Sequence, residues 1–393
     1  MMATDACLWG QAMWRFLTAG ESHGPGLTVI IDGVPAGVPI DEDRIAHDLR
    51  RRQGGYGRGG RMLIERDRAE VRGGVHKGYT TGAPVALWIE NRDWVNWKDK
   101  DPPPITVPRP GHADLAGALK FGHRDLRIVG ERSSARETTA RVAAGAVAKA
   151  FLGELGIRIY SHVVAIGEVT APAYDLEWDE LFARAEASEV RCADADTTER
   201  MKARIDAAKQ AGESLGGIFE VAAVGVPPGL GSYTQWDRKL DGLLAQAILS
   251  INAIKGVEFG EGFAVARLPG TQAQDPIRWG PGRPMRTTNR AGGLEGGTTN
   301  GEPIVLRAAM KPIATTVTRQ DSVDLLTGQE TKMEYQRSDV CAVPAAAVVG
   351  EAMVALVLAR AVQEKFGGDH LAETRAALEH FLAARGWLTA RPD

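Results

Sequence analysis

The sequence predicts an α+β fold in which antiparallel sheets surround buried helices. Strand-like and helix-like segments do not alternate strictly along the 393 residues, which argues against a doubly wound parallel sheet. The segment 343–359 is apolar on every side of a helix, as in a helix that a core encloses. No convincing linker is visible, so we expect a single domain over residues 13–388, preceded by an extension at 1–12 outside the fold.

The first elements follow from hydrophobic patterns and capping residues. Residues 27–31 predict a strand that ends in a turn at Gly33, and Asp41 is the expected N-cap of a helix over 42–52. A loop rich in glycine and arginine follows at 53–61. Short strands are expected at 62–65, 70–75 and 84–90.

The middle of the chain predicts a long loop and then a helix of small residues. Residues 91–111 are polar and contain three consecutive prolines, which neither a helix interior nor a central strand accepts. Ser134 and Glu137 form the capping-box pattern that opens a helix over 135–155. Strands are then expected at 157–166 and 218–226, with amphipathic helices at 175–188 and 196–212 between them.

The last third continues the mixture, with a helix over 238–250, strands at 257–259, 263–268 and 304–310, and two final helices. The first of these two contains the apolar segment. Pro344 suits its first turn, Glu351 interrupts it, and no second candidate span accompanies it. It is therefore predicted to be a buried core helix and not a membrane span.

Composition excludes several classes of protein. A net charge of −3 gives no sign of a nucleic-acid or membrane partner, so an anion site must come from locally clustered Arg and Lys. Cys7, Cys192 and Cys341 are widely spaced, which predicts free thiols in a reducing cytoplasm. The sequence lacks a secretory signal, phosphate-loop, dinucleotide-binding and serine-hydrolase motifs, and paired metal-ligand spacing.

Two early segments have compositions that core packing does not explain. Residues 18–26 place Ser22 and His23 among glycines, and histidine exchanges protons near neutral pH, although a loop histidine is more often structural. Residues 49–61 suit phosphate or carboxylate binding, although an RNA-binding segment and a solvated loop share this composition. This segment contains five glycines and the arginines Arg50, Arg51, Arg52, Arg58 and Arg61.

A third segment places His112 in a Pro-Gly turn at 109–114. About twenty residues later, Ser133 and Ser134 are expected at a helix N-terminus, where free N–H groups and the helix dipole favour a phosphate. Plain capping explains Ser134 equally well.

A fourth segment, 289–301, contains five glycines against which a planar ligand could lie. Lys311 and Arg337 follow it and supply positive charge. A flexible surface loop with solvated charges explains this segment equally well.

Nine segments, in order and spanning residues 18–345, together resemble the chorismate synthase family. Each is weak alone, but nine in order leave little room for coincidence. They are TAGESHG (18–24), RRRQGGYGRGGRM (50–62), RPGHADL (109–115), ERSSARETT (131–139), QWDRKLD (235–241), INAIKGVEFG (251–260), GGLEGGTTNGEPI (292–304), MKPIATT (310–316) and RSDVCAVPA (337–345).

The resemblance implies a fold, a reaction and a cofactor. The fold would be a β-α-β sandwich with helices packed between two antiparallel sheets, and the protein would be a homotetramer. The reaction would be the anti 1,4-elimination of phosphate from 5-enolpyruvylshikimate 3-phosphate, giving chorismate in the shikimate pathway to aromatic amino acids. It would require reduced FMN without net redox change, with NADPH as the indirect reductant.

The resemblance also implies site residues. His23 and His112 match the catalytic histidines, Asp339 matches the acidic residue near the flavin, and Arg52 and Arg58 match arginines that contact NADP or a substrate anion. A protonated His23 would neutralise the leaving phosphate, His112 would stabilise the reduced flavin, and Asp339 would position or relay a proton. The FMN contacts match Arg132, Ser133, Ser134, Asn252, Ala253, Gly296, Lys311, Pro312, Ile313, Ala314, Thr315 and Arg337.

Two other functions would also use parts of this sequence. An RNA-binding protein that uses the Arg-Gly loop would carry excess positive charge and more than one basic tract. A flavin-binding protein or flavin reductase would not act on shikimate compounds. The bifunctional members of the family carry insertions that this chain lacks, so we expect the monofunctional type, supplied with reduced FMN by an external flavin reductase.

Overall fold

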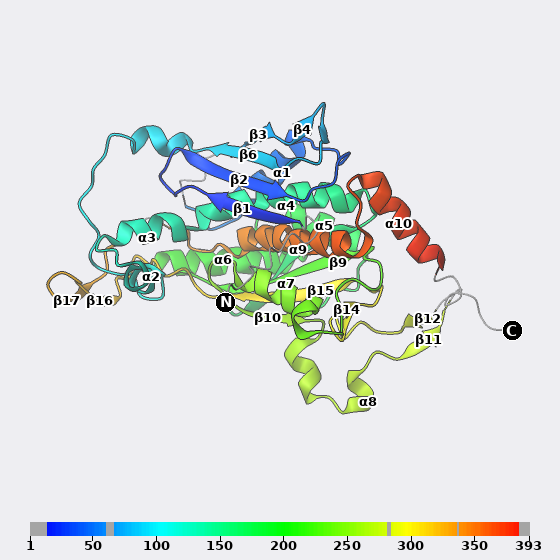
Figure 1. The fold of residues 1–393 in the computed structure, drawn as a ribbon. Helices are drawn as coiled ribbons and strands as arrows, with labels where there is room; N and C mark the ends of the chain where they lie inside the picture. The colour runs from blue at the N-terminus through cyan, green and yellow to red at the C-terminus, as the bar shows by residue number, and fades with distance from the viewer. Residues whose placement is uncertain (1–13, 60–66, 281–283, 336–337, 385–393) are drawn as a thin grey trace, which may run out of the picture.

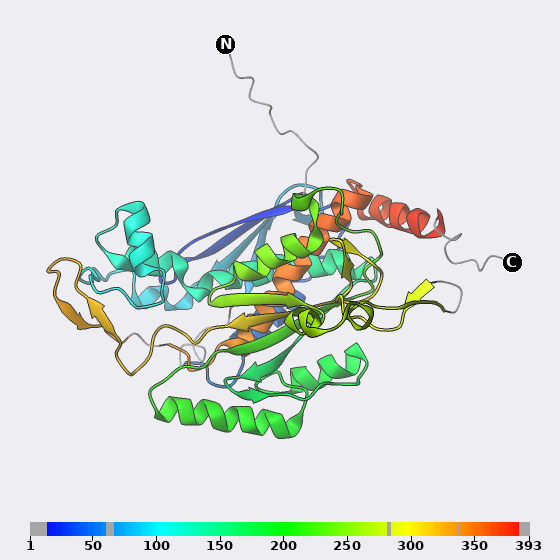
Figure 2. The ribbon, with the colours of Figure 1, turned by 90° about the horizontal axis from the view of Figure 1, so that it is seen from below.

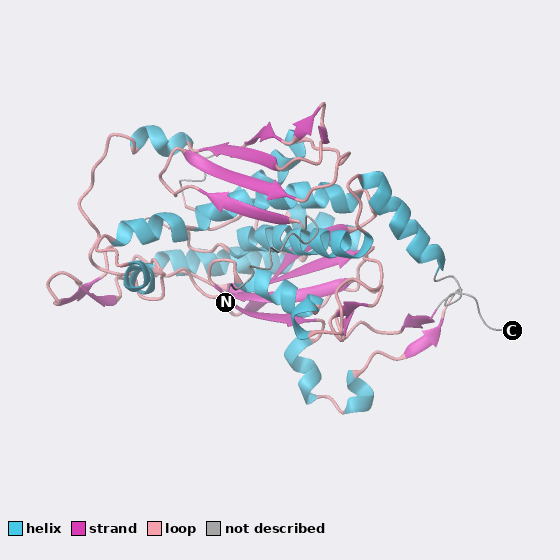
Figure 3. Cartoon of the chain, viewed as in Figure 1, coloured by secondary structure: helices cyan, strands magenta, loops and turns pink. Residues whose placement is uncertain are grey.

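The computed structural model describes residues 14–59, 67–280, 284–335 and 338–384, in which helices pack between two antiparallel sheets. In Figure 1 one sheet lies above and one below a layer of helices, and Figure 3 shows the same layers by element type. The predicted sandwich is therefore confirmed. The predictions for the extension at 1–12, the strand at 62–65 and Cys7 lie outside the described residues.

The first sheet has the strand order β1-β2-β6-β3, with antiparallel neighbours. Successive side chains point to opposite faces of a strand, so Leu27, Val29 and Ile31 of β2 face the helices and are buried. The outer face exposes Leu17 and Ile30, which pair across β1 and β2. The strands are β1 (Arg15–Ala19), β2 (Gly26–Asp32), β3 (Ala69–Gly73) and β6 (Val85–Glu90), and a small hairpin joins β4 (Val75–His76) to β5 (Tyr79–Thr80).

The second sheet has the order β10-β15-β9-β7-β8 and is also antiparallel. Phe219 and Val221 of β9 are buried against the helix layer, where the helix α9 (Val343–Phe366) packs on this strand. The strands are β7 (Arg158–Ile166), β8 (Val169–Thr170), β9 (Gly217–Val224), β10 (Ile254–Phe259) and β15 (Ile304–Met310).

Three helices fill the space between the sheets: α1 (Glu42–Gln53), α4 (Thr138–Gly153) and α9 (Val343–Phe366). As predicted, the Asp41 side chain caps α1 by accepting a hydrogen bond from the Asp43 amide. The small residues of α4 allow it to approach α9 closely. A Cβ placed on Gly145 would lie only 2.3 Å from the Cβ of Ala352.

Helix α9 is long and apolar enough to cross a membrane by length and composition, but 89% of its most apolar window is buried inside the molecule. Pro344 lies in its first turn, and the side chain of Glu351 is fully enclosed. The prediction of a buried core helix is confirmed.

The remaining elements surround the sandwich. Helices α2, α3 and the hairpin β16–β17 lie at one end in Figure 1, and Figure 2 shows α5 and α6 beside the second sheet. The helices are α2 (Asp114–Phe121), α3 (Leu126–Ser133), α5 (Trp178–Ala187), α6 (Ala195–Gln210), α7 (Leu240–Leu249), α8 (Gly270–Ala273) and α10 (Leu371–Ala384). The hairpins are β11–β12 (Ile277–Trp279, Pro284–Arg286), β13–β14 (Leu294–Glu295, Thr298–Thr299) and β16–β17 (Asp321–Val323, Glu330–Lys332).

Some predictions were wrong in detail. The segment 263–268 is not a strand but part of a 3-10 helix, Gly262–Arg267, in which Phe263 is exposed. The loop at 91–111 contains a 3-10 turn, Arg92–Asn96, that Asn91 caps. Short 3-10 turns also precede α7, at Trp236–Arg238, and α4, at Ala135–Glu137.

The capping box at the start of α4 is only half formed. Ser134 Oγ accepts a hydrogen bond from the Arg136 amide, as a cap does. The Glu137 carboxylate instead accepts hydrogen bonds from Thr18 and Arg141. These partners compete for the carboxylate, so the predicted reciprocal bond to the cap gives way to tertiary contacts.

Candidate active site

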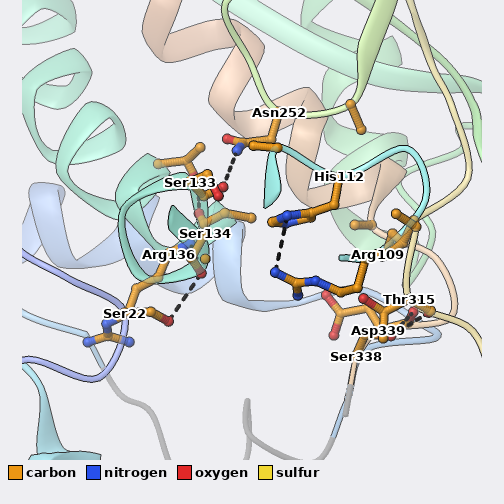
Figure 4. Close-up of a pocket in the computed structure, with 18 of the residues that line it drawn as sticks. Ser22, Arg109, His112, Ser133, Ser134, Arg136, Asn252, Thr315, Ser338 and Asp339 are labelled. Atoms are coloured by element: carbon orange, nitrogen blue, oxygen red, sulfur yellow. Dashed lines mark hydrogen bonds between the residues drawn. The ribbon is translucent and has the colours of Figure 1, made fainter. Parts of the chain in front are cut away.

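A cavity of about 830 Å³ lies at the end of the sandwich where α1 ends and where α4 and α9 begin. Loops from both halves of the chain close it, and Figure 4 shows several of their side chains turned toward the same space. Its lining includes thirteen of the predicted site residues: His23, Arg52, Arg58, His112, Ser133, Ser134, Asn252, Ala253, Lys311, Ile313, Ala314, Thr315 and Asp339.

His23 lies in the short loop between β1 and β2. The carboxylate of Glu131 accepts a hydrogen bond from the His23 amide at 2.7 Å, and its other oxygen lies 2.6 Å from His23 Nδ1. The amide of Asn91 donates to the carbonyls of Ser22 and Gly24. These contacts hold the histidine at the cavity wall. The loop begins at Gly20, where φ is +108° and a Cβ would lie 2.4 Å from a backbone oxygen, so only glycine fits there.

His112 belongs to a second cluster on the cavity wall, with Arg109 and Asp114. The guanidinium of Arg109 donates to both carboxylate oxygens of Asp114, at 2.7 and 2.8 Å. His112 Nδ1 lies 2.6 Å from Asp114 Oδ1. It also lies 3.1 Å from Arg109 Nη2, the contact drawn in Figure 4. Burial alone would raise the pKa of Asp114, but hydrogen bonds from Arg109 and His112 outweigh it and hold that pKa well below its usual range.

The predicted arginines are fixed by hydrogen bonds at the other side of the cavity. Arg52 is 5% exposed and donates to Thr138 Oγ1 at 3.0 Å and to the Ala135 carbonyl at 2.8 Å. Arg58 lies 3.2 Å from Asp339, whose other oxygen accepts from the Gly59 amide at 2.6 Å. The predicted acidic residue is thus ion-paired with a predicted anion-binding residue.

The segment after β15 forms a further wall. The Lys311 ammonium donates to the Gly111 carbonyl, which links this wall to the His112 turn. Ser214 donates to the Ile313 carbonyl, and Ser338 donates to the Thr315 carbonyl at 2.9 Å. Nearby, the Asn252 amide donates to the Ser133 carbonyl at 2.9 Å (Figure 4).

Four predicted contacts are not part of the described cavity lining. Arg132 is exposed and donates to the Thr18 and Gly20 carbonyls. Gly296 lies in the turn between β13 and β14, which contacts the start of α7. Asn252, which lines the cavity, follows the opposite end of α7. Pro312 lies between two lining residues, and Arg337 is outside the described residues.

One local expectation for a phosphate site was wrong. Ser133 does not begin a helix: it is the last residue of α3, and its hydroxyl donates to the Val129 carbonyl. Ser134 is the cap of the turn before α4, and its hydroxyl also lies 3.1 Å from Ser22 Oγ. The sequence did not reveal α3, which ends at Ser133, whereas the predicted cap at Ser134 is observed.

The structure adds residues that sequence reasoning missed. Glu131 and Asp114 hold the two histidines, Arg136 lines the cavity at 6% exposure, and the Trp97 ring lies 4.0 Å from the His23 ring. Glu131, Asp114 and Arg136 lie inside segments already singled out. Asp114 contacts neighbours two and five residues away, whereas Glu131 and Arg136 contact His23 and Asp67, which lie 108 and 69 positions earlier in the sequence.

The described part of the Arg-Gly segment, residues 49–59, does not have the form of an RNA-binding loop. Arg51 is 8% exposed and binds the carboxylates of Asp48, Glu186 and Glu351 in the interior, and Arg52 faces the cavity. Among the described residues, no three His, Cys, Asp or Glu side chains are grouped so as to hold a metal ion.

Comparison with known proteins decides the family. The chorismate synthase family model matches residues 14–363. The chain belongs to the chorismate synthase family. The chorismate synthases of Symbiobacterium thermophilum and Rubrobacter xylanophilus are each 56% identical to it, over 390 and 387 residues, covering 95% and 96% of this chain and 98% and 99% of those proteins.

The chorismate synthase fold is also shared in three dimensions. A crystal structure of chorismate synthase superimposes with a TM-score of 0.80 at 45% sequence identity, covering 96% of this chain and 100% of the other. The predicted family and fold are thus confirmed.

Proposed function

We propose that this protein eliminates phosphate from 5-enolpyruvylshikimate 3-phosphate to give chorismate, as a lyase of the shikimate pathway that uses reduced FMN without net redox change. Membership of the chorismate synthase family supports this reaction. The observation that carries the proposal is one cavity lined by His23, His112, Arg52 and Lys311 together with Asp339. Clustered cations at a concave site suit a substrate that carries a phosphate and two carboxylates.

The residues of the cavity fit FMN. Its volume of about 830 Å³ lies in the range of small-molecule sites, and apolar side chains such as Ile105, Leu126 and Ile313 line it beside the cations. Gly130 also lines the cavity, and its lack of a side chain leaves space for a ligand. A Cβ at this position would lie 3.1 Å from Arg109 Nη2. The proposed contacts are Ser133, Ser134, Asn252, Ala253 and the segment 311–315.

Three further FMN contacts are proposed: Arg337, Arg132 and Gly296. Arg337 is proposed from the family resemblance alone. Arg132 and Gly296 do not line the cavity within one chain. A contact from Arg132 or Gly296 to a ligand in the cavity would therefore come from a second copy of the chain. This agrees with the homotetramer that we also propose. The exposed pair Leu17 and Ile30, on the open face of the first sheet, supports association.

The chain's own residues would bind the substrate and move protons. Reduced FMN, when bound, supplies the electron density that the elimination needs. Arg52 and Arg58 would hold the anionic groups of the substrate. His23 would donate a proton to the leaving phosphate, which neutralises the charge of the phosphate as the C–O bond breaks. His112 holds positive charge beside the cofactor. Asp339 holds or relays the proton lost from the substrate.

The test is an anaerobic assay of phosphate release with chemically reduced FMN. His23→Ala and His112→Ala should each lower turnover by roughly 10²- to 10⁴-fold, the usual contribution of a general acid or base. The matched control is His380→Ala, on the exposed surface of α10, which should leave turnover unchanged. Near-normal rates for the His23 and His112 variants would remove both residues from the mechanism.

The source of the reduced flavin is tested by replacing the chemical reductant with NADPH. We propose a cytoplasmic, monofunctional enzyme for which NADPH acts only indirectly, through a separate flavin reductase. Phosphate release should therefore require both NADPH and an added reductase. Turnover with NADPH and FMN alone would contradict this part of the proposal.

A further inference from the structure

Glu131 holds the His23 loop by three hydrogen bonds. Its backbone carbonyl accepts from the Ser22 amide at 3.1 Å, and its carboxylate Oε2 accepts from the His23 amide at 2.7 Å. The second carboxylate oxygen, Oε1, lies 2.6 Å from His23 Nδ1. Glu131 of α3 therefore holds both the backbone and the ring of His23.

The charge of Glu131 decides which ring nitrogen carries a hydrogen. Burial alone would raise the pKa of this carboxyl, but the hydrogen bonds from the ring and amide of His23 outweigh it and lower the pKa below its ordinary value. An ionised carboxylate only accepts hydrogen bonds, so at 2.6 Å the Nδ1 atom must carry the hydrogen. Nε2 is then the ring nitrogen that gains and loses a proton.

The ring is also held from its face. The Trp97 and His23 ring centroids lie 4.0 Å apart with the planes inclined by 36°. Both aromatic residues and Glu131 line the cavity, and the His23 side chain keeps 28% of its surface exposed there. Rotation of the ring would break the Nδ1 contact and disturb this packing, so one orientation is favoured.

We propose that Glu131 is the positioning residue of His23: it fixes the ring with Nδ1–H on the carboxylate and leaves Nε2 to exchange the proton within the cavity. In the proton transfer, Nε2 of the imidazolium gives its proton to an oxygen of the leaving phosphate, and the neutral ring keeps Nδ1–H. The positioning stands on the contacts above, and only its effect on rate rests on the proposed function.

The substitution Glu131→Gln reverses the hydrogen-bond preference at nearly constant shape. If its amide oxygen accepts from the His23 backbone N–H, as Oε2 does now, its NH2 group must face Nδ1. A donor in that place favours the tautomer with the hydrogen on Nε2. If Glu131 had only a structural role, Glu131→Gln would leave the hydrogen on the same nitrogen of the His23 ring.

The first measurement is nitrogen-15 NMR of histidine-labelled protein without substrate, at a pH where the ring is neutral. Subtraction of the His23→Ala spectrum identifies the His23 signals. We expect Nδ1–H in the unaltered protein and Nε2–H in Glu131→Gln. The same tautomer in both proteins, or Nε2–H in the unaltered protein, would overturn the proposal whatever the activity.

The second measurement is a double-mutant cycle on anaerobic phosphate release. Glu131→Gln should lower kcat by about 10- to 100-fold with KM unchanged, the range found for partners that orient functional histidines. In the His23→Ala background the same change should have no further effect, because the partner is gone. Equal effects in both backgrounds would show that Glu131 acts independently of His23.

Two further variants separate positioning from folding. Glu131→Asp keeps the charge and should restore part of the lost kcat together with the Nδ1–H tautomer. Glu180→Gln removes an exposed carboxylate of α5 that pairs with Arg184, and should change neither kcat nor the spectrum. If His23→Ala itself keeps a normal rate, the role proposed for His23 fails, and the NMR result alone then decides on Glu131.

Discussion

At the scale of single residues, the cavity depends on charged side chains whose positions are fixed by neighbours. Arg52 is an example, since its guanidinium donates from Nε and Nη2 to two different oxygens at the start of α4. Arginine offers five donors in a rigid plane, so it can donate to two oxygens at once while its positive charge lines the cavity. Lysine carries the same charge but cannot do both.

We therefore predict that Arg52→Lys weakens binding of the phosphorylated substrate although the charge is unchanged. The loss should be about tenfold in KM, equivalent to ~1.4 kcal/mol, with a smaller change in kcat. Steady-state kinetics with reduced FMN measure both. Thr138→Val, which removes only the acceptor for Nε, should give a smaller effect in the same direction; an unchanged KM in both would contradict the role of Arg52.

The sequence predicted those candidate residues that lie in or beside segments of unusual composition. His23, His112 and Arg52 lie in segments with unusual glycine and charge content, and Lys311 follows another glycine-rich segment. The structure brings all four to one cavity. Asp114 lies two residues from His112 in the same segment, but the contact of Glu131 with His23 was not predictable. Glu131 looks like an ordinary helical glutamate until folding places α3 beside the loop between β1 and β2.

At the scale of elements, the close crossing of α4 and α9 sets the spacing of the helix layer. A Cβ on Gly145 would lie 2.5 Å from Cα of Ala352, so the two backbones are nearly in contact. Glycine lowers helix propensity by about 1 kcal/mol relative to alanine. Its use in the middle of α4 is therefore explained by packing and not by local preference.

We predict opposite effects for two glycine-to-alanine substitutions in helices. Gly145→Ala should destabilise the protein by about 1–3 kcal/mol, because the added methyl overpacks the crossing. Gly242→Ala, on the exposed side of α7 with no atom near its Cβ position, should stabilise it by up to about 1 kcal/mol. Urea unfolding gives both values. A stabilising Gly145→Ala would show that the helices can separate without cost.

Most elements were predictable because their patterns are local. The Asp41 cap, the alternating strand β2 and the uniformly apolar α9 each carry their signal within a few turns. Helices α2 and α3 have eight residues each and weaker patterns, so they were missed. The segment 263–268 was predicted as a strand, but none of the described strands pairs with it, and most of it forms a 3-10 helix instead.

At the scale of the whole molecule, a cluster of buried charges joins the helix layer to the second sheet. Glu351 of α9 is fully buried and accepts hydrogen bonds from Arg51 of α1, Lys149 of α4 and Ser161 of β7. Arg191 lies 3.3 Å from the same carboxylate. Removal of one member leaves the others as uncompensated buried charges, which typically costs about 3–5 kcal/mol.

Acid should therefore weaken the molecule through this cluster. Burial alone would raise the pKa of Glu351, but Arg51 and Lys149 outweigh it and lower that pKa well below its ordinary value of 4.5. The pKa values of Asp48 and Glu186 are lowered as well, again against burial. A carboxyl with a lowered pKa in the folded state contributes stability above its unfolded pKa and loses it as the pH falls through the folded value.

We predict that the free energy of unfolding, measured with urea at fixed protein concentration, falls as the pH is lowered below about 4.5, by up to ~1.4 kcal/mol per pH unit for each such carboxyl. Glu351→Gln should be about 3–5 kcal/mol less stable at pH 7 and should lose less on acidification, because it has one carboxyl fewer to protonate. Glu180→Gln, at the surface, should follow the unaltered protein at every pH. Parallel curves for Glu351→Gln and the unaltered protein would place the acid-sensitive groups outside the cluster.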